Sequence, residues 1–404
     1  MQHINGGVCA PKGFKAGGVH CGIRKSRVKR DLALILSEVP ASASAVYTQN
    51  LVKGAPIYVT QRNLMNGIAQ AAICNSGNAN TCNADGEDVA WQMCQLAANA
   101  AGLKPEDVIV ASTGVIGQPL PIQPIIEGMP ALYAAVHENG SQEAAEAIMT
   151  TDTRLKEVAV SFTVDGMECK LGGIAKGSGM IHPNLATMLV FLTCDAAIAP
   201  HMLKKALADN VQDTFNMTSV DGDTSTNDMV CIMANGMAGN AMIAAEGPAY
   251  DAFCEALNEV TTTLCRMIAK DGEGATRLLT CCVSGGKTLK DAKLAAKAVV
   301  CSSLFKAAIF GADANWGRVL CALGYSGADI DVKAVDVTFR SVKGEITVCK
   351  NGASLPFSEE IAKEILLEDE IDVLITLHDG DAKATAWGCD LTYDYVKING
   401  DYRT

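Results

Sequence analysis

The sequence predicts an α+β fold, in which hairpins of antiparallel strands pack beside separate helices. Apolar and polar residues alternate over 157–171 on both sides of an Asp165-Gly166 turn, which is typical of a β-hairpin. Long helical patterns stand alone at 86–101 and 248–270. The last part of the chain carries several strand patterns around a single helical pattern. This order differs from the regular strand–helix alternation of a doubly wound sheet.

In the first half of the chain, β-branched and apolar runs predict strands, and glycine and proline mark their ends. The helix at 86–101 places Ala, Leu and Met on one face and meets a stop at Gly102. Pro119, Pro121 and Pro124 are expected to exclude regular structure from their segment. Further strands are expected at 31–36, 45–48, 70–74 and 107–112, and a further helix at 141–149.

The second half continues the mixed pattern. Residues 188–193 form a short apolar run rich in strand formers, which predicts a buried strand. Pro200 opens a helix that is expected to reach about residue 215. The length of the chain favours two domains, which we place at 1–285 and, as a smaller α/β unit, at 286–404. Further helices are expected at 289–305 and 358–367, and strands at 277–283, 334–340, 345–349, 371–377 and 381–387.

Composition limits the function classes. The net charge of −12 on 404 residues argues against a nucleic-acid or anionic-membrane partner. The sequence contains no apolar stretch of roughly 18 residues and no leader pattern at its start. The sixteen cysteines are scattered without a CxxC pair, which predicts reduced thiols, no metal site and a cytoplasmic protein. One basic patch is the exception to the acidic balance, and we interpret it as a solvated surface: Arg24, Lys25, Arg27, Lys29 and Arg30.

A glycine-rich segment over 172–179 leads to Thr187, which stands at the entrance of the predicted strand 188–193. Glycine permits positive φ and a close approach to a ligand, and Pro183 fixes φ just ahead of the threonine. Thr187 in this place suits a nucleophile, although most threonines at strand entrances only cap or pack. His182, five residues earlier, suits either an acid–base group or a structural hydrogen bond.

Two motifs surround this threonine: Lys176-Gly177-Ser178-Gly179-Met180-Ile181 and Asn184-Leu185-Ala186-Thr187-Met188-Leu189. They resemble the self-cleavage segment of the ornithine acetyltransferase family, the glutamate N-acetyltransferases of arginine biosynthesis. Members of that family cut the bond before the threonine autocatalytically, and the new amino-terminal threonine accepts the acetyl group. The resemblance implies cleavage between Ala186 and Thr187, giving pieces 1–186 and 187–404. Further matches to the family lie at 75–80, 221–227 and 313–318.

The same resemblance implies the site residues. As an amino terminus, Thr187 can use its own α-amine as the base, because a reference pKa of about 7.7–8.0 leaves a neutral fraction near pH 7. Thr113 and Gly114 match the family's oxyanion pair, although a plain strand-to-loop turn is the alternative. Lys176 matches the residue that holds the substrate α-carboxylate. The other implied substrate contacts are Thr153, with Thr151 as its alternative, Glu273 for the substrate's amino group, Asn399, Thr404 and Thr187 itself.

The implied activity is transfer of acetyl from N2-acetyl-L-ornithine to L-glutamate through acetyl-Thr187, without a cofactor. Whether acetyl-CoA is a second donor stays open. The implied fold is a β-sandwich flanked by helices with a smaller C-terminal α/β lobe, and the implied assembly is an α2β2 heterotetramer. One alternative is an amino-terminal-nucleophile amidase or aminopeptidase, in which water takes the acyl group. The other is an uncleaved binding protein without activity.

Overall fold

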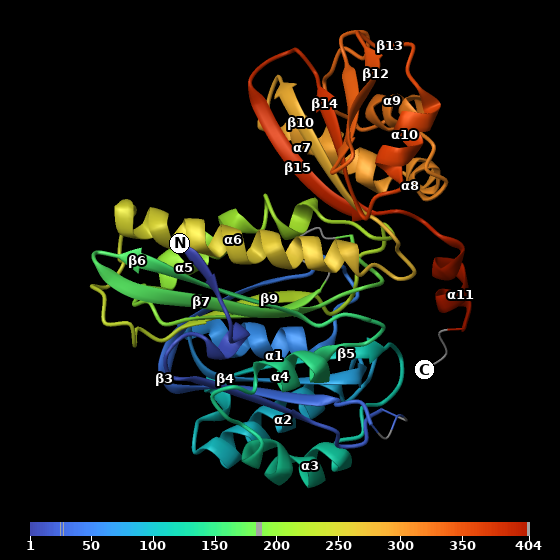
Figure 1. Ribbon diagram of the computed structural model, residues 1–404. Coiled ribbons are helices and arrows are strands. Elements are labelled where there is room, and N and C mark those ends of the chain that lie inside the picture. The colour runs from blue at the N-terminus through green and yellow to red at the C-terminus, as the bar shows by residue number, and fades with distance from the viewer. Residues whose placement is uncertain (25, 27, 183–187, 402–404) are drawn as a thin grey trace.

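The computed structural model describes residues 1–24, 26, 28–182 and 188–401. Two β-sheets, each accompanied by helices, form a larger N-terminal domain and a smaller C-terminal domain (Figure 1). The α+β class predicted from the sequence is therefore confirmed.

The larger sheet has nine strands within the described residues, in the order β1-β6-β7-β8-β9-β3-β4-β5, and β2 pairs with β3. The pairing of β8 with β9 and of β4 with β5 is parallel, and the other neighbours are antiparallel. The strands are β1 (Gln2–Ile4), β2 (Phe14–Val19), β3 (Leu32–Tyr47), β4 (Ile68–Asn78), β5 (Val108–Val115), β6 (Lys156–Val164), β7 (Met167–Lys176), β8 (Leu189–Cys194) and β9 (Met229–Ala234).

Strand β3 turns this sheet into a sandwich. Its first part pairs with β4. The β3–β4 register shifts between Leu36 and Ala41, a stretch that contains Pro40. Its last part, Ser42 to Tyr47, pairs with β9. The expected strands at 31–36 and 45–48 are thus two halves of one strand that belongs to both layers.

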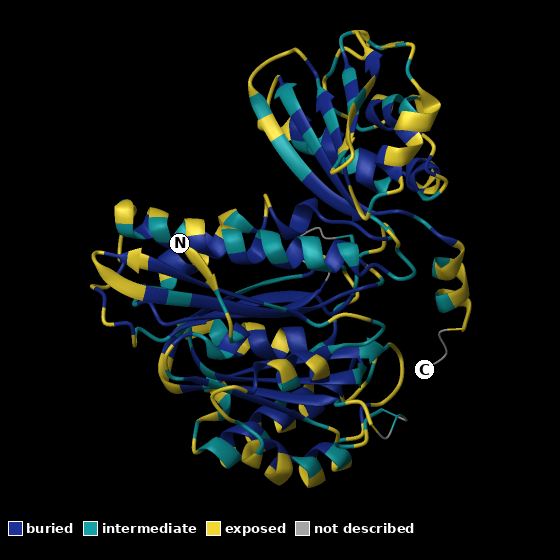
Figure 2. Ribbon diagram, viewed as in Figure 1, coloured by how far each residue is buried: buried dark blue, intermediate teal, exposed yellow. Residues whose placement is uncertain are grey.

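An apolar core separates the two layers. Phe191 of β8 and Cys231 of β9 face Ile35 of β3 and Ile109 of β5 across it. Alternate residues of the same strands point outward, where helices bury them. Figure 2 shows these strands as the most continuously buried part of the molecule. The helices on the outer faces are α5 (Pro200–Asn210) and α6 (Pro248–Lys270) on one side, and α1 (Ala55–Asn63), α2 (Gly86–Ala101) and α3 (Gln123–Ala134) on the other, with α4 (Ser141–Ile148) packed beside β2 and β3.

The smaller sheet has the order β13-β12-β11-β14-β10-β15. Strand β10 pairs with β14 and β15, so this sheet begins at Leu278. The boundary expected between 285 and 286 therefore falls inside a strand. The strands are β10 (Leu278–Gly286), β11 (Asp336–Ser341), β12 (Gly344–Lys350), β13 (Ala353–Ser354), β14 (Glu370–Thr376) and β15 (Ala382–Cys389), and the helices are α7 (Leu289–Cys301), α8 (Ser303–Phe310), α9 (Trp316–Gly324), α10 (Glu359–Leu366) and α11 (Tyr393–Asp401).

Three helix predictions need correction. The proline-rich segment contains α3, because Pro124 lies in its first turn, where the missing N–H costs nothing. The helix expected at 289–305 is two helices, because Ser302 ends α7 and its hydroxyl accepts the N–H of Phe305 at 3.3 Å to cap α8. The helix opened by Pro200 ends at Asn210, earlier than expected.

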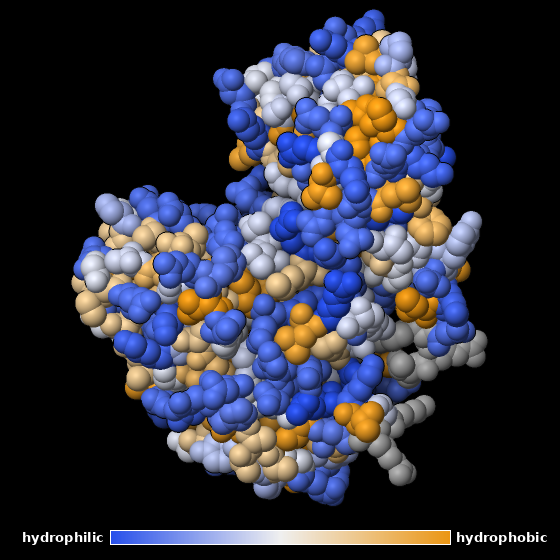
Figure 3. Space-filling model, viewed as in Figure 1, coloured by the Kyte–Doolittle hydropathy of each residue, from blue (hydrophilic) through white to orange (hydrophobic). Residues whose placement is uncertain are grey.

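The surface and the cysteines complete the description. The face drawn in Figure 3 is largely hydrophilic, with small separate hydrophobic spots. None of the helices in the described part combines the length and apolar character needed to cross a membrane. Among the described residues, His, Cys, Asp and Glu form no group of three or more that suits a metal ion. All sixteen cysteines are free thiols.

Candidate active site

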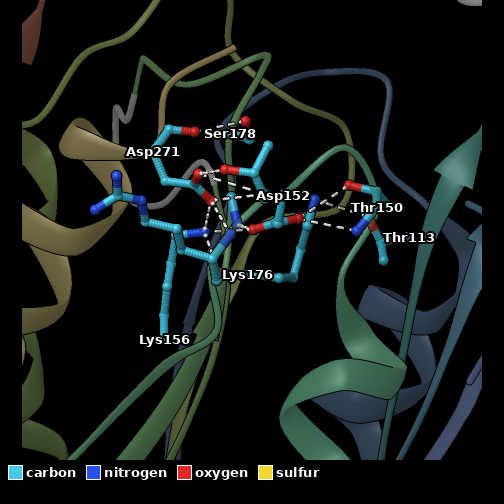
Figure 4. Close-up of polar contacts among 10 residues, drawn as sticks. Thr113, Thr150, Asp152, Lys156, Lys176, Ser178 and Asp271 are labelled. Atoms are coloured by element: carbon cyan, nitrogen blue, oxygen red, sulfur yellow. Dashed lines mark hydrogen bonds and ion pairs between the residues drawn. The ribbon is translucent and has the colours of Figure 1, made fainter. Parts of the chain in front are cut away.

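The carboxyl ends of β5 and β7 bring together two of the predicted site residues. Lys176 ends β7, and its Nζ donates a hydrogen bond to Thr113 Oγ1 of β5 at 3.2 Å. Both side chains are buried, at 9% and 8% exposure. Because β5 and β7 belong to different layers, this contact joins the layers at one end of the sandwich (Figure 4).

Gly114 follows Thr113 in a backbone conformation that requires glycine. Its φ is +135°, and a Cβ placed there would lie 2.3 Å from the carbonyl carbon of Gly77. The pairing of Gly77 with Gly114 therefore lets β4 and β5 approach closely at their ends. The side chain of Asn227 holds the neighbouring loop against this end, donating to the carbonyls of Ala79 and Ser112.

A buried cluster of charges lies beside Lys176. The Nζ atom of Lys156 contacts Asp152 Oδ1 at 2.7 Å and Asp271 Oδ2 at 2.5 Å, and Lys156 is 1% exposed. Asp152 also accepts the N–H groups of Gly177 at 2.7 Å and Thr150 at 2.9 Å. These segments are far apart in sequence, so the cluster ties the start of β6, the end of β7 and the end of α6 together.

The charge state of Asp152 follows from its partners. Burial alone would raise the pKa of this carboxyl, but the ammonium groups of Lys156 and Lys176 hold the pKa well below its usual range. Asp152 is therefore ionised throughout the neutral range. With Asp271, Lys156 and Lys176 it forms a set of two carboxylates and two ammonium groups.

Thr153 contacts Asp271 rather than standing apart from the cluster. Its hydroxyl and its N–H both donate to the Asp271 carboxylate, and the N–H of Arg154 does so as well at 3.2 Å. The predicted contact between Thr153 and a substrate stays a prediction, and so does the alternative, Thr151. The structure places Thr153 within one residue of Asp152, at the edge of the cluster.

The glycine-rich segment is fixed by backbone contacts. Ser178 Oγ donates to the carbonyl of Asp271 at 2.7 Å, and its own carbonyl accepts the N–H of Glu273 at 3.0 Å. A Cβ on Gly179 would lie 2.3–2.4 Å from the Glu273 carboxyl group. Glycine at 179 therefore allows Glu273 to lie directly against the segment. The left-handed residue here is Met180, at φ 57°, which is uncommon for a residue with a side chain.

Contacts from the 219–229 region hold both flanks of the predicted cleavage segment. Asp221 accepts the N–H groups of Met180 at 2.6 Å and Ile181 at 2.8 Å. On the other flank, the N–H of Met229 donates to the carbonyl of Met188 at 2.9 Å. The predicted cleavage residues Ala186 and Thr187 themselves lie outside the described residues.

The C-terminal helix returns to the larger domain at this site. Asn399 Nδ2 of α11 donates to Glu273 Oε2 at 2.7 Å, and the hydroxyl of Tyr395 donates to Asp221 at 3.3 Å. Two predicted substrate contacts, Glu273 and Asn399, are thus direct neighbours. The third C-terminal prediction, Thr404, lies outside the described residues.

His182 makes structural contacts. Its Nδ1 lies 3.1 Å from Ser219 Oγ and 3.5 Å from Cys301 Sγ. Burial, together with the charge of Lys297, lowers the pKa of His182 to about 4. A neutral imidazole with these partners fits the structural alternative stated from the sequence.

Sequence reasoning missed the three charged residues that organise the site, Asp152, Lys156 and Asp271. Two of them stand inside motifs that the resemblance already used, between Thr151 and Thr153 and just before Glu273. A weak signal for the third was present, because Lys156 opens an otherwise apolar strand pattern. A lysine in that position needs buried partners of opposite charge.

Comparison with known proteins identifies the family. The sequence profile described as the ArgJ family matches residues 15–404. The arginine biosynthesis bifunctional protein ArgJ of Caldanaerobacter subterraneus subsp. tengcongensis is 51% identical over 405 residues, covering 100% of both chains. The protein of the same name from Bacillus subtilis is 47% identical over 403 residues, covering 99% of this chain and 97% of its own. The crystal structure of the arginine biosynthesis bifunctional protein ArgJ from Bacillus halodurans is 45% identical with a TM-score of 0.51, and it covers 54% of this chain and 100% of its own.

These matches confirm the resemblance found in the motifs, since they extend over nearly the whole chain and half of the aligned residues are identical. This chain belongs to the ArgJ family of arginine-biosynthesis enzymes.

Proposed function

We propose that the chain cleaves itself between Ala186 and Thr187, and that Thr187 then carries acetyl from N2-acetyl-L-ornithine to L-glutamate. The observation that carries this proposal is the contact between Lys176 and Thr113. It lies at the end of β7, which leads into the cleavage segment whose two flanks are hydrogen-bonded to Asp221 and Met229. One ammonium group and one hydroxyl are there within 3.2 Å of each other, in a buried place. Family membership makes the reaction class the natural one for this arrangement.

The geometry supports a division of labour between Thr113 and Lys176. Lys176 Nζ donates to Thr113 Oγ1, so the hydroxyl hydrogen of Thr113 remains available to donate to another group. That donor, with the N–H of Gly114, suits the oxyanion of a tetrahedral intermediate. The ammonium of Lys176 suits the α-carboxylate that acetylornithine and glutamate share. One binding position therefore serves both half-reactions.

The opposite end of acetylornithine carries an ammonium group, and Glu273 supplies the matching charge. Its carboxylate lies against Gly179 and receives Asn399, so it is held in place before a ligand arrives. A preorganised carboxylate costs less to order when the ammonium binds. Thr153, Asn399 and Thr404 complete the proposed set of substrate contacts.

The reaction needs a proton acceptor for the Thr187 hydroxyl, and the α-amine released by cleavage fills this role. The acetyl group then forms an ester with Thr187 while ornithine leaves with the proton. Glutamate attacks the ester through its α-amine, and the threonine hydroxyl is restored. No metal or cofactor takes part in these steps.

Cleavage is supported by the extent of one comparison. The piece 187–404 would hold 218 of the 404 residues, or 54% (404 − 186 = 218). The Bacillus halodurans structure covers the same share of this chain with 100% of its own. We also propose an α2β2 assembly in the cytoplasm, and acetyl-CoA as a second donor, the latter because relatives carry the name bifunctional.

The test is mass spectrometry of the purified protein together with an assay of glutamate acetylation. We expect pieces of 186 and 218 residues from the natural protein, and a single inactive chain of 42.3 kDa from Thr187→Ala. Thr163→Ala, an exposed threonine of β6, is the matched control and should still be cut and active. Cleavage at this bond in Thr187→Ala would contradict the mechanism.

The covalent step has its own test. Enzyme incubated with acetylornithine alone should gain one acetyl group on the 218-residue piece, and double-reciprocal plots for the two substrates should be parallel. Intersecting plots without an acetylated piece would mean direct transfer. Release of acetate that glutamate does not divert would instead identify the hydrolase alternative.

A further inference from the structure

Asp228 is a buried acid that the reaction above does not use. It directly precedes β9 and is 3% exposed. Within the part of the chain that the structure describes, its Oδ2 atom has no hydrogen-bond partner. Buried carboxyl oxygens are almost always hydrogen-bonded, because an unpaired one costs free energy. An exception at this place therefore needs an explanation.

The strand register brings Asp228 to the site. Lys176 pairs with Leu189, and Leu189 pairs with Met229, so these three residues form one row across β7, β8 and β9. Asp228 is the next residue beyond that row. Adjacent strands lie about 4.8 Å apart, so the backbones of Lys176 and Met229 are roughly 10 Å apart and a lysine side chain spans much of that distance. Met229, the residue after Asp228, donates its N–H to the carbonyl of Met188, which follows Thr187 in the sequence.

Lys176 is the charged group that acts on Asp228. Burial raises the pKa of Asp228 well above its usual value, and a hydrogen bond with Ser225 and the charge of Lys176 oppose this only in part. The residues that contact the backbone here, Thr48 and Met188, carry no titratable side chain.

Two other titratable groups on which Lys176 acts, Asp152 and Cys74, keep a constant charge near neutral pH. Asp152 stays ionised beside Lys156, as described above. Burial raises the pKa of the Cys74 thiol to about 12, although Lys176 and Arg24 both act on it. Besides the α-amine that cleavage would give Thr187, Asp228 is therefore the described group near Lys176 whose charge can change in response to a ligand.

We propose that an ionised Asp228 and a carboxylate ligand on Lys176 exclude each other, so that substrate binds with Asp228 protonated. This inference rests on the proposed role of Lys176 in binding the substrate α-carboxylate. The two carboxylates and two ammonium groups of the neighbouring cluster already balance. A substrate carboxylate and an ionised Asp228 together would add two negative charges to a place with little water, where like charges repel strongly.

The proton balance of this coupling is simple. Where Asp228 is ionised in the free enzyme, binding takes up one proton from solvent, and the proton bonds to a carboxyl oxygen of Asp228. No bond of the substrate changes. Where Asp228 is already protonated, the ligand binds without proton uptake. The affinity for carboxylate ligands therefore falls as pH rises through the titration of Asp228.

The test is calorimetric titration of the processed natural enzyme and of Asp228→Asn with L-ornithine between pH 6.5 and 9.5. At pH values above the pKa of Asp228, the affinity of the natural enzyme for ornithine should fall with each pH unit. This fall should exceed that of Asp228→Asn by a factor of up to about ten per pH unit. The α-amines of ornithine and of the processed Thr187 titrate in both experiments, so the comparison removes their contribution.

Asp195→Asn is the matched control. Asp195 is also a buried aspartate whose pKa burial raises, but it follows the opposite end of β8 and accepts the N–H groups of Lys12 and Lys170. This variant should keep the pH dependence of the natural enzyme. An equal pH dependence in the natural enzyme and Asp228→Asn overturns the coupling and leaves the proposed reaction in place. Absence of ornithine binding by the natural enzyme at every pH overturns both.

A second measurement counts the protons exchanged on binding. The heat of ornithine binding to the natural enzyme is measured in buffers with different ionisation enthalpies, at the pH where affinity declines. The dependence on buffer gives the number of protons exchanged, after subtraction of the proton that ornithine itself exchanges. The same measurement on Asp228→Asn gives the part that the Thr187 α-amine contributes. A larger net uptake by the natural enzyme than by Asp228→Asn supports the coupling, and equal uptake in the two proteins overturns it.

Discussion

The charge of Lys176 affects the pKa of two buried aspartates, Asp152 and Asp228, which differ in their other partners. Asp152 accepts hydrogen bonds from Lys156, Gly177 and Thr150, whereas Oδ2 of Asp228 has no partner among the described residues. Lys156 and Lys176 lower the pKa of the first, and burial raises that of the second. The comparison separates two uses of a buried acid. The compensated one fixes the ends of β6, β7 and α6, and the uncompensated one leaves the ammonium of Lys176 available.

The largest effect should come from breaking the compensated side. Lys156→Met removes the ammonium between Asp152 and Asp271 and leaves two buried carboxylates close together. Loss of one partner from a buried ion pair costs about 3–5 kcal/mol. Urea unfolding measures this loss, and it is best done in the Thr187→Ala background, where a single chain unfolds.

Lys205→Met is the control for that measurement. Lys205 is an exposed lysine of α5 that also contacts two carboxylates, Asp209 and Glu246, and its removal should cost far less. If Lys156→Met and Lys205→Met lose similar free energies of unfolding, the buried Lys156 cluster stabilises the fold no more than an exposed ion pair does.

A smaller effect is expected at Glu273, the carboxylate that we propose binds the ammonium group of the substrate. In Glu273→Gln, the amide keeps the shape and can still accept a hydrogen bond from Asn399, but it loses the charge that suits an ammonium group. A charge-assisted hydrogen bond contributes about 1.5–3 kcal/mol, which corresponds to a rise in KM for acetylornithine of about 10- to 150-fold. Steady-state kinetics measure this change, and cleavage should remain complete.

Glu259→Gln provides the control, since Glu259 is a carboxylate of α6 that lies 2.8 Å from His3 Nε2, away from the site. Its KM should match that of the natural enzyme. An unchanged KM in Glu273→Gln would remove Glu273 from the substrate position.

The smallest effect is a difference in the pH dependence of stability. The lowered pKa of Asp152 means that its stabilising contribution is complete at neutral pH and decreases as pH falls below about 4, the value for an unfolded chain. The raised pKa of Asp228 has the opposite sign, so the natural protein should lose stability relative to Asp228→Asn as pH rises above about 4. Each unit of pH contributes at most about 1.4 kcal/mol per proton.

Unfolding of the natural protein, Asp152→Asn and Asp228→Asn between pH 3.5 and 8 measures both trends. The stability advantage over Asp152→Asn should narrow in acid, and that over Asp228→Asn should narrow toward alkaline pH. Parallel curves for the two variants would mean that the two aspartates experience the same environment.

Local sequence signals predicted those elements that carry their own end markers. Helices α2 and α6 have the predicted bounds, because Gly102 stops the first and Pro248 opens the second. The proline-rich segment misled for a related reason. Pro124 occupies the first turn of α3, where proline is tolerated, and Pro130 lies inside the same helix, so proline content did not exclude a helix here. The predicted boundary between 285 and 286 falls inside β10, and the sequence could not show this because β10 pairs with β14 and β15, strands that lie about a hundred residues further along the chain.

The site divides in the same way. The resemblance singled out Lys176 and Thr113, and the structure brings them into contact. Nothing in the sequence pattern joins Lys156 to Asp271, because these residues are 115 positions apart. A charged residue is expected to be exposed unless a buried partner of opposite charge is known. Asp228 is more hidden still, since its significance lies in a missing partner. Only the folded chain shows that an acid is both buried and incompletely hydrogen-bonded.

The pairing of β7 with β8 has a consequence for how the enzyme would unfold once it is cut as proposed. These strands are neighbours from Leu171 opposite Cys194 to Lys176 opposite Leu189, with β6 and β9 on their outer sides. Scission between them removes a covalent link and none of these ladder hydrogen bonds. Unfolding of the cut protein nevertheless releases two molecules instead of one. Its melting temperature should therefore rise with protein concentration, as for a dimer, while that of uncut Thr187→Ala should not.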